Sequence, residues 1–149
     1  MVIRKATSRE IQKILAYSPV VMKESTMGFV EGSKDIASQM MSQILADGGY
    51  YLVYMEEKVV QGWVGIGQFY NSYSDEMEGM IAELYVLPQY RKTGIAERLL
   101  ESAFNRLTEE GFKKVKLNVY SGSPAKYLYE KLGFHDVSTM MEKDFNENE

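Results

Sequence analysis

Two different spacings of apolar side chains divide this chain into strands and helices. In residues 114–120 apolar and polar side chains alternate, which is the period of a strand with one buried face. In residues 95–107 apolar side chains recur at steps of three and four, which is the period of an amphipathic helix. A chain that mixes the two periods predicts helices packed on a sheet.

The same periods, read along the whole chain, predict the order of the elements. Predicted strands cover 2–6, 50–55, 59–70, 80–87, 114–120 and 134–143, and predicted helices cover 9–16, 34–46, 94–110 and 124–132. Residues 18–32 and 71–78 show neither period and are expected to be irregular. The order β-α-α-β-β-β-α-β-α-β is that of an α/β fold with a mixed (α+β) sheet. We expect one domain over residues 1–149, with 146–149 as a frayed tail.

Capping residues support several of these helix boundaries. Thr7 or Ser8 is a suitable N-cap for the first predicted helix, because a hydroxyl oxygen accepts from an otherwise unpaired N–H group. The last predicted helix has Ser123 as N-cap, Pro124 at the first helical position and Gly133 just past its end.

Composition excludes several kinds of site. The chain has no cysteine and a single histidine, His135, which excludes a disulfide framework and a thiolate zinc site, and we expect no metal site. The net charge of −4 argues against nucleic acid as a partner. No apolar run approaches the roughly 20 residues that cross a bilayer, and residues 1–7 lack the apolar core of a secretory signal. We therefore expect a cytoplasmic protein without a membrane partner.

The segment 83–100 joins an apolar strand to an amphipathic helix through a loop that ends at Gly94. Such a loop presents backbone N–H groups at the positive end of a helix, where a phosphate or pyrophosphate group binds readily. Ala96 in the first helical turn is small and leaves room for a ligand. Close packing of the helix on the sheet would also account for Gly94 and Ala96, so this segment alone leaves two interpretations open.

A second motif decides between them. It consists of Leu117, Val119, Ala125, Tyr129, Gly133 and Phe134. Together the two motifs resemble those of the GCN5-related N-acetyltransferases, the GNAT superfamily. The family pattern Arg/Gln-x-x-Gly-x-Gly/Ala is matched by residues 91–96, and the pattern Leu-x-Val, then Asn-x-x-Ala-x-x-x-Tyr-x-x-x-Gly-Phe, is matched by the second motif. One position departs from the pattern, since Gly122 stands where the family often has Asn.

The resemblance implies a GNAT-like fold that binds acetyl-CoA as the acetyl donor. By the family's pattern, Leu84 and Val86 hydrogen-bond the pantetheine arm through their backbone, and one of their N–H groups polarises the thioester carbonyl. The pyrophosphate would lie against the N–H groups of Arg91, Lys92, Thr93, Gly94, Ile95 and Ala96. The contact made by the missing Asn would come from Asn118 or Ser121.

The resemblance also implies two catalytic side chains. Tyr129 would give a proton to the leaving thiolate, or would only hold the thiol in place. Glu83 would take a proton from the amine, directly or through a water, although a solvated carboxylate on a strand explains it equally well. Glu78 and Tyr85 are weaker candidates for the same role.

These expectations describe an N-acetyltransferase that passes acetyl directly from acetyl-CoA to a primary amine. Acidic residues in the loop 75–78 favour a small cationic amine as the acceptor. The alternative is a non-catalytic acyl-CoA-binding sensor or partner module with the same fold. Met22, Met27 and Phe29 are expected in the core or a lid, or lining a pliable substrate pocket. A homodimer is common among similar proteins and is compatible with this sequence.

Overall fold

The computed structural model describes residues 1–146, and in this part of the chain the strands form one mixed sheet. The strands are β1 (Val2–Lys5), β2 (Tyr50–Glu56), β3 (Val59–Asn71), β4 (Glu76–Val86) and β5 (Val115–Lys116), hydrogen-bonded in the order β1-β2-β3-β4-β5. Neighbouring strands run antiparallel except β4 and β5, which are parallel. The predicted mixed sheet is therefore confirmed.

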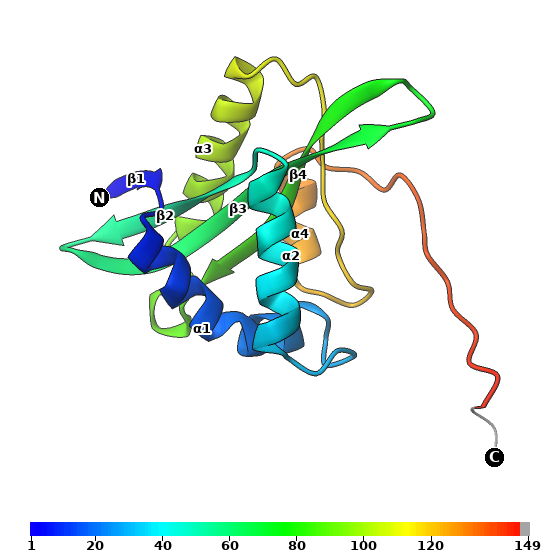
Figure 1. Ribbon diagram of the computed structural model, residues 1–149, viewed down its shortest axis with the longest axis horizontal. Helices are drawn as coiled ribbons and strands as arrows, with labels where there is room; N and C mark the ends of the chain where they lie inside the picture. Colours follow the sequence, from blue (N-terminus) through cyan, green and yellow to red (C-terminus); the bar gives the residue numbers. More distant parts are fainter. Residues whose placement is uncertain (147–149) are drawn as a thin grey trace.

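Helices cover both faces of this sheet (Figure 1). One face packs against α1 (Ser8–Ser25) and α2 (Lys34–Ala46), and the other against α3 (Ile95–Glu109) and α4 (Ala125–Lys131). A short 3-10 turn, η1 (Pro88–Tyr90), lies between β4 and the loop before α3. Successive side chains of β2 pack into the two cores in turn, because side chains alternate along a strand. Leu52 faces α3, Val53 faces α1 and α2, and neither is exposed.

The first two helices begin at hydroxyl caps, the first of them at the predicted Thr7. Thr7 caps α1 in a capping box, in which its hydroxyl accepts from the Glu10 N–H and the Glu10 carboxylate accepts from the Thr7 N–H. The Ser33 hydroxyl accepts from the Ile36 N–H at 3.3 Å and caps α2. The observed bounds of α2 are those predicted, 34–46.

The last helix begins one residue later than predicted. Pro124, expected at the first helical position, is the N-cap of α4, and the helix itself starts at Ala125. Ser123, the predicted cap, still contributes to this end, since its hydroxyl oxygen accepts from the Ala125 N–H at 3.3 Å.

The first helix is longer than predicted. It continues through Pro19 to Ser25, although the sequence predicts an end at Ala16. Pro19 removes one intrahelical hydrogen bond, but Val21 beyond it is buried in the core against the sheet and holds the second half of the helix in place. The following loop also returns onto this point, because a Cβ at Gly32 would overlap the Pro19 carbonyl oxygen.

The predicted final strand, 134–143, does not form. Residues 134–146 are irregular and extend away from the sheet (Figure 1). Their apolar residues suggested a strand, yet Val137, Met140 and Met141 are 68%, 97% and 87% exposed. Apolar residues without a partner strand or a covering helix gain nothing from an extended pairing conformation. Of the predicted tail, residues 147–149 lie outside the described part of the chain.

Candidate functional site

Strand β4 has an open edge over its second half. It pairs with β5 only at Gly79 and Met80, and β5 itself spans two residues instead of the predicted 114–120. Beyond Met80 the two parallel strands separate, so the edge of residues 81–86 is not covered by a neighbouring strand. The long predicted strand fails for the same reason, because residues 117–120 have left their pairing partner.

The backbone groups on this open edge belong to Leu84 and Val86. The Leu87 N–H donates to the Gln61 carbonyl of β3 at 2.9 Å. Because backbone N–H groups alternate along a strand, those of Leu84 and Val86 point away from β3. The Val86 carbonyl confirms this direction, since it accepts from Arg91 Nε at 2.8 Å on the open side. Two N–H donors therefore lie on an edge to which an extended chain can add.

The open edge leads to the N-terminus of α3, which no side chain caps. Gly94 is the N-cap residue, with φ 87°, and it makes no capping hydrogen bond, unlike the caps of α1 and α2. A Cβ at Gly94 would meet nothing within 4 Å, so the loop needs glycine for its dihedral angle and leaves free space beside it. Lys92 is exposed, Ala96 is half-buried and Ile95 is buried in the core below. The N–H groups of the first turn are available to an anion.

The other side chains of this loop hold it in shape. Arg91 turns back toward α1, where its Nη2 lies 3.2 Å from Glu24 Oε1. The second oxygen of Glu24 accepts from the Tyr85 hydroxyl at 3.1 Å, which ties the end of α1 to the end of β4. The Thr93 hydroxyl donates to the Tyr90 carbonyl at 2.8 Å. The side chains of Arg91 and Thr93 thus hold the loop in shape, and the Arg91 N–H also donates within the protein, to the Pro88 carbonyl at 3.4 Å.

The end of α4 fixes the ring of Tyr129. The Phe134 N–H donates to the Tyr129 carbonyl at 3.0 Å and the Gly133 N–H donates to the Glu130 carbonyl at 3.1 Å, which together form a Schellman C-cap. The apolar contact typical of this cap is also present, because the Phe134 ring packs edge-on against the Tyr129 ring with centroids 5.8 Å apart. The spacing Tyr-x-x-x-Gly-Phe therefore has a local structural cause.

The hydroxyl of Tyr129 remains free to act on a ligand. It makes no hydrogen bond with any other residue of the described range 1–146, and burial raises the pKa of this phenol above its ordinary value. A phenol with a raised pKa stays protonated near neutral pH and is a proton donor.

Strand β4 contains one extra residue relative to β3, next to Glu83. Gly65 pairs with Glu83 and Ile66 pairs with Ile81, so Ala82 is a bulge without a partner on β3. Two successive side chains, Ala82 and Glu83, then face α1 and α2. The residue that follows, Leu84, has its side chain in the core on the α3 side.

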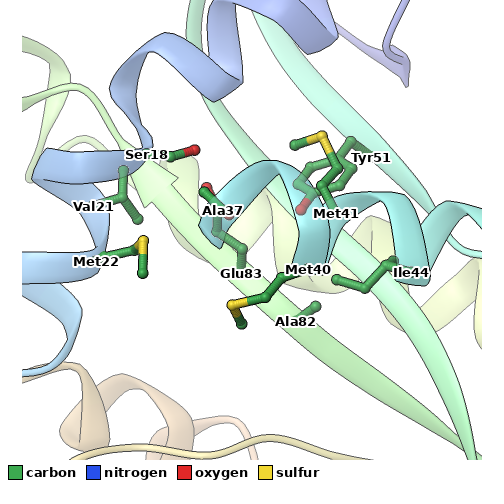
Figure 2. Close-up of a pocket in the computed structure, with 10 residues that line it drawn as sticks. All are labelled: Ser18, Val21, Met22, Ala37, Met40, Met41, Ile44, Tyr51, Ala82 and Glu83. Atoms are coloured by element: carbon green, nitrogen blue, oxygen red, sulfur yellow. The ribbon is translucent and has the colours of Figure 1, made fainter. Parts of the chain in front are cut away.

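Glu83 lies in a pocket of about 60 Å³ between α1 and α2 (Figure 2). Trp63, which is buried, donates from Nε1 to Glu83 Oε2 at 2.6 Å. Desolvation raises the pKa of the Glu83 carboxyl above its ordinary value, and only the Trp63 hydrogen bond acts against this shift. Burial and the Glu83 charge also raise the pKa of Tyr51. Other residues around this carboxyl are Ser18, Val21, Met22, Ala37, Met40, Met41, Ile44 and Ala82.

The remaining candidates are placed differently. Glu78 is buried with its Oε1 2.8 Å from Lys116 Nζ, and it accepts from Asn71 Nδ2 at 3.2 Å, so hydrogen bonding to Lys116 lowers its pKa. Tyr85 is engaged with Glu24 as described above. Asn118 is exposed on the segment that separates from β4.

Sequence reasoning missed two parts of the site. Trp63 comes from β3, and no local motif connects it with Glu83. Met40, which no motif of the sequence marks, lines the pocket together with Met22. The expectation that Met22 could line a pliable pocket agrees with its position.

Comparison with known proteins identifies the family. The family description Acetyltransferase (GNAT) domain matches residues 20–146. The chain therefore belongs to the GNAT acetyltransferase family, as its fold and motifs indicate. Within residues 1–146 no helix is long and apolar enough to span a membrane, and no group of three acidic, histidine or cysteine residues is arranged to hold a metal ion.

Individual relatives are similar in part of the sequence or in fold. The [ribosomal protein bS18]-alanine N-acetyltransferase of Haemophilus influenzae is 33% identical over 60 residues, which span 40% of this chain and 41% of that protein. A putative acetyl transferase from Pyrococcus furiosus has a TM-score of 0.83 at 22% identity, over 97% of this chain and 99% of that one. A predicted acetyltransferase from Clostridium acetobutylicum, with acetyl-CoA, has a TM-score of 0.76 at 20% identity, over 96% and 95%. At these identities the structural likeness shows the fold.

Proposed function

We propose that this protein is an acetyl-CoA-dependent N-acetyltransferase that passes acetyl directly to a primary amine. The observation that carries the proposal is that three features meet along β4. These are the open edge of Leu84 and Val86, the N-terminus of α3 that no side chain of residues 1–146 caps, and the half-buried carboxyl of Glu83 on the face of the sheet that packs against α1 and α2. Membership of the GNAT family supports the same reaction.

Acetyl-CoA supplies an acetyl group activated as a thioester, and the residues of the donor side suit it. The N–H groups of Leu84 and Val86 would bind the amide-bearing arm, and one of them would polarise the thioester carbonyl as an oxyanion donor. The N–H groups of residues 92–96 would bind the pyrophosphate, whereas the N–H of Arg91, expected to take part, donates to the Pro88 carbonyl. The free space beside Gly94 supports this fit, because a ligand can approach the backbone there without meeting a side chain.

Glu83 and Tyr129 would handle the protons of the reaction. The amine arrives as an ammonium ion, and Glu83 would accept its proton, because a carboxyl with a raised pKa is a better matched base near neutral pH than an ordinary one. Tyr129, protonated and without a partner in the described residues, would give a proton to the leaving thiolate. The absence of cysteine from the sequence supports direct transfer without an acyl-cysteine intermediate.

The acceptor is proposed to be a small cationic amine, but the support comes from Glu83 and not from the loop 75–78. Asp75 accepts from the Tyr70 hydroxyl, Glu76 lies 4.0 Å from Lys113 Nζ and Glu78 is paired with Lys116, so the three carboxylates have partners inside the protein. Among the candidate carboxylates, that of Glu83 has no cationic partner within residues 1–146 and would face the incoming ammonium ion.

Calorimetric titration with acetyl-CoA, with ATP as the control, tests the donor side. We expect binding of acetyl-CoA in the micromolar range and none of ATP, followed by thiol release when amines are added. No binding of acetyl-CoA or coenzyme A would overturn the proposal. Binding of acetyl-CoA without turnover of any amine would favour the non-catalytic sensor or partner module instead.

A further inference from the structure

The pocket that holds Glu83 is apolar around a single charge. Its walls are mostly aliphatic and thioether side chains, with Val21 and Met22 from α1 and Met40 and Ile44 from α2 (Figure 2). The hydroxyl of Ser18 donates within α1 to the Ile14 carbonyl at 3.3 Å. Glu83 is therefore the only charged side chain among those that line the pocket.

Glu83 differs from the other buried and half-buried carboxylates named above in having no cationic partner within residues 1–146. Glu10 lies 2.8 Å from Arg4, and Glu78 lies 2.8 Å from Lys116. Glu83 is half-buried, accepts a hydrogen bond from the neutral indole of Trp63 through Oε2, and receives none from the described residues at Oε1, which opens to the pocket. A carboxylate partly removed from water without a counter-charge is costly to the fold, and a ligand that carries one ammonium group would offset this cost.

Resting on the proposed acetyl transfer, we propose that this pocket selects primary monoamines that carry a short alkyl group. The ammonium group pairs with Glu83, and the alkyl group packs against Met22 and Met40. A diamine or polyamine is discriminated against, because its second ammonium group would lie among mainly apolar side chains without a second carboxylate to pair with. The preferred acceptor is thus narrower than a cationic amine in general.

The volume of the pocket limits the alkyl group. A pocket of about 60 Å³ is well below the ~150 Å³ of a cavity that admits benzene. It encloses a chain of a few carbon atoms, whereas an aromatic ring would extend through its open side or require the walls to move. Met22 and Met40 are unbranched and flexible, so they can adjust to linear or branched chains of this size.

A matched pair of amines tests the selection. n-Butylamine and 1,3-diaminopropane have the same number of heavy atoms and differ in one ammonium group. We expect kcat/KM, measured by thiol release with saturating acetyl-CoA, to be at least tenfold higher for n-butylamine. The peptides Val-Gly-Gly and Lys-Gly-Gly repeat the comparison with the α-amino group of a peptide N-terminus as the acceptor. Val-Gly-Gly carries an alkyl side chain and Lys-Gly-Gly a second ammonium group. Comparing the two peptides with the two amines shows whether the acceptor is a free amine or a peptide N-terminus.

Substitutions at two exposed positions test the selection further: one at Met40 is designed to reverse the preference for the monoamine, and one at Val20 is its control. Met40 lines the pocket and is 58% exposed, so Met40→Glu places a second carboxylate at the rim with little risk to the core. We expect it to raise the ratio of kcat/KM for 1,3-diaminopropane over n-butylamine at least tenfold. Val20, on α1, is 52% exposed and does not line the pocket, so Val20→Glu adds the same charge without the contact and should leave the ratio within about twofold.

The outcomes separate this inference from the proposed function. Equal or better use of 1,3-diaminopropane or spermidine than of n-butylamine by the unmodified protein would overturn the selection while acetyl transfer stands. An equal change of the ratio in Met40→Glu and Val20→Glu would overturn it too, since net charge would then explain the effect. Failure of acetyl-CoA to bind would overturn the proposed function itself. Calorimetric binding of n-butylamine in the presence of coenzyme A, lost in Glu83→Gln, gives support that does not depend on turnover.

Discussion

Substitution of the glycines at the two ends of α3 separates backbone strain from ligand binding. Gly94 precedes the helix with φ 87°, and Gly111 follows it with φ 92°. A Cβ at either position would meet nothing within 4 Å. Gly94→Ala and Gly111→Ala therefore impose the same kind of strain on the same helix, while only the first places a methyl group beside the proposed pyrophosphate site.

The expected losses of stability are similar in the two variants. A non-glycine residue in the left-handed region costs about 1–2 kcal/mol, and no steric clash adds to it at either site. For a protein of this size each kcal/mol lowers the Tm by roughly 2–4 °C, so both variants should melt about 2–8 °C lower. Losing one hydrogen bond to a charged phosphate group costs about 1.5–3 kcal/mol, which lowers acetyl-CoA affinity roughly 10- to 150-fold in Gly94→Ala alone.

Thermal denaturation and calorimetric titration with acetyl-CoA measure the two effects separately. We expect matched Tm values in the pair and an affinity loss confined to Gly94→Ala. Equal affinities in the two variants would show that the ligand does not approach Gly94. A Tm of Gly94→Ala far below that of Gly111→Ala would show that the space beside Gly94 is not open.

Three further substitutions test individual side chains of the site. Tyr129→Phe removes a hydroxyl that has no partner in residues 1–146. We expect kcat to fall about 100-fold, with the acetyl-CoA affinity and the Tm unchanged. An unchanged kcat would show that Tyr129 takes no part in the chemistry. Burial raises the Glu83 pKa in the folded state, so its charge destabilises the fold as the pH rises above the unfolded value of about 4.3. Glu83→Gln should therefore have a higher Tm than the unmodified protein at pH 7 and an equal Tm below about pH 4. Its pH profile of kcat/KM should lose the acid limb. A lower Tm at pH 7 would contradict the expected effect of the Glu83 charge. Arg91→Lys keeps a cation near Glu24 but loses the hydrogen bond from Nε to the Val86 carbonyl. We expect the acetyl-CoA affinity to fall about fivefold. An unchanged affinity would show that this bond does not position the open edge of β4.

The predicted elements were right where local signals and burial agree. The second helix has a capping serine, a regular apolar face and a terminal Gly-Gly, and its bounds were predicted correctly. The first helix was predicted too short, because the local cost of Pro19 says nothing of the burial of Val21 beyond it. The prediction of a final strand was wrong, because the apolar pattern of 134–143 does not reveal whether a partner strand exists.

The candidate site shows the same division between local and long-range information. The motif of residues 91–96 and the cap that holds Tyr129 are local, and the structure has the geometry that their spacing predicts. The environment of Glu83 depends on Trp63 from another strand and on two helices that precede it in the chain. Strict alternation would place Ala82 and Glu83 on opposite faces, and no sequence signal marks the bulge that brings them together.

That bulge lies between two stretches of β4 that already alternate in phase. Ile81 before it and Leu84 after it both face α3, while Ala82 and Glu83 both face α1 and α2. A strand without Ala82 would therefore keep Glu83 on the pocket side and the N–H groups of Leu84 and Val86 on the open edge, because regular alternation gives the same directions. The extra residue instead bends the strand and increases its twist, so it sets the angle between the donor edge and the acceptor pocket and leaves unchanged the direction in which each of them points.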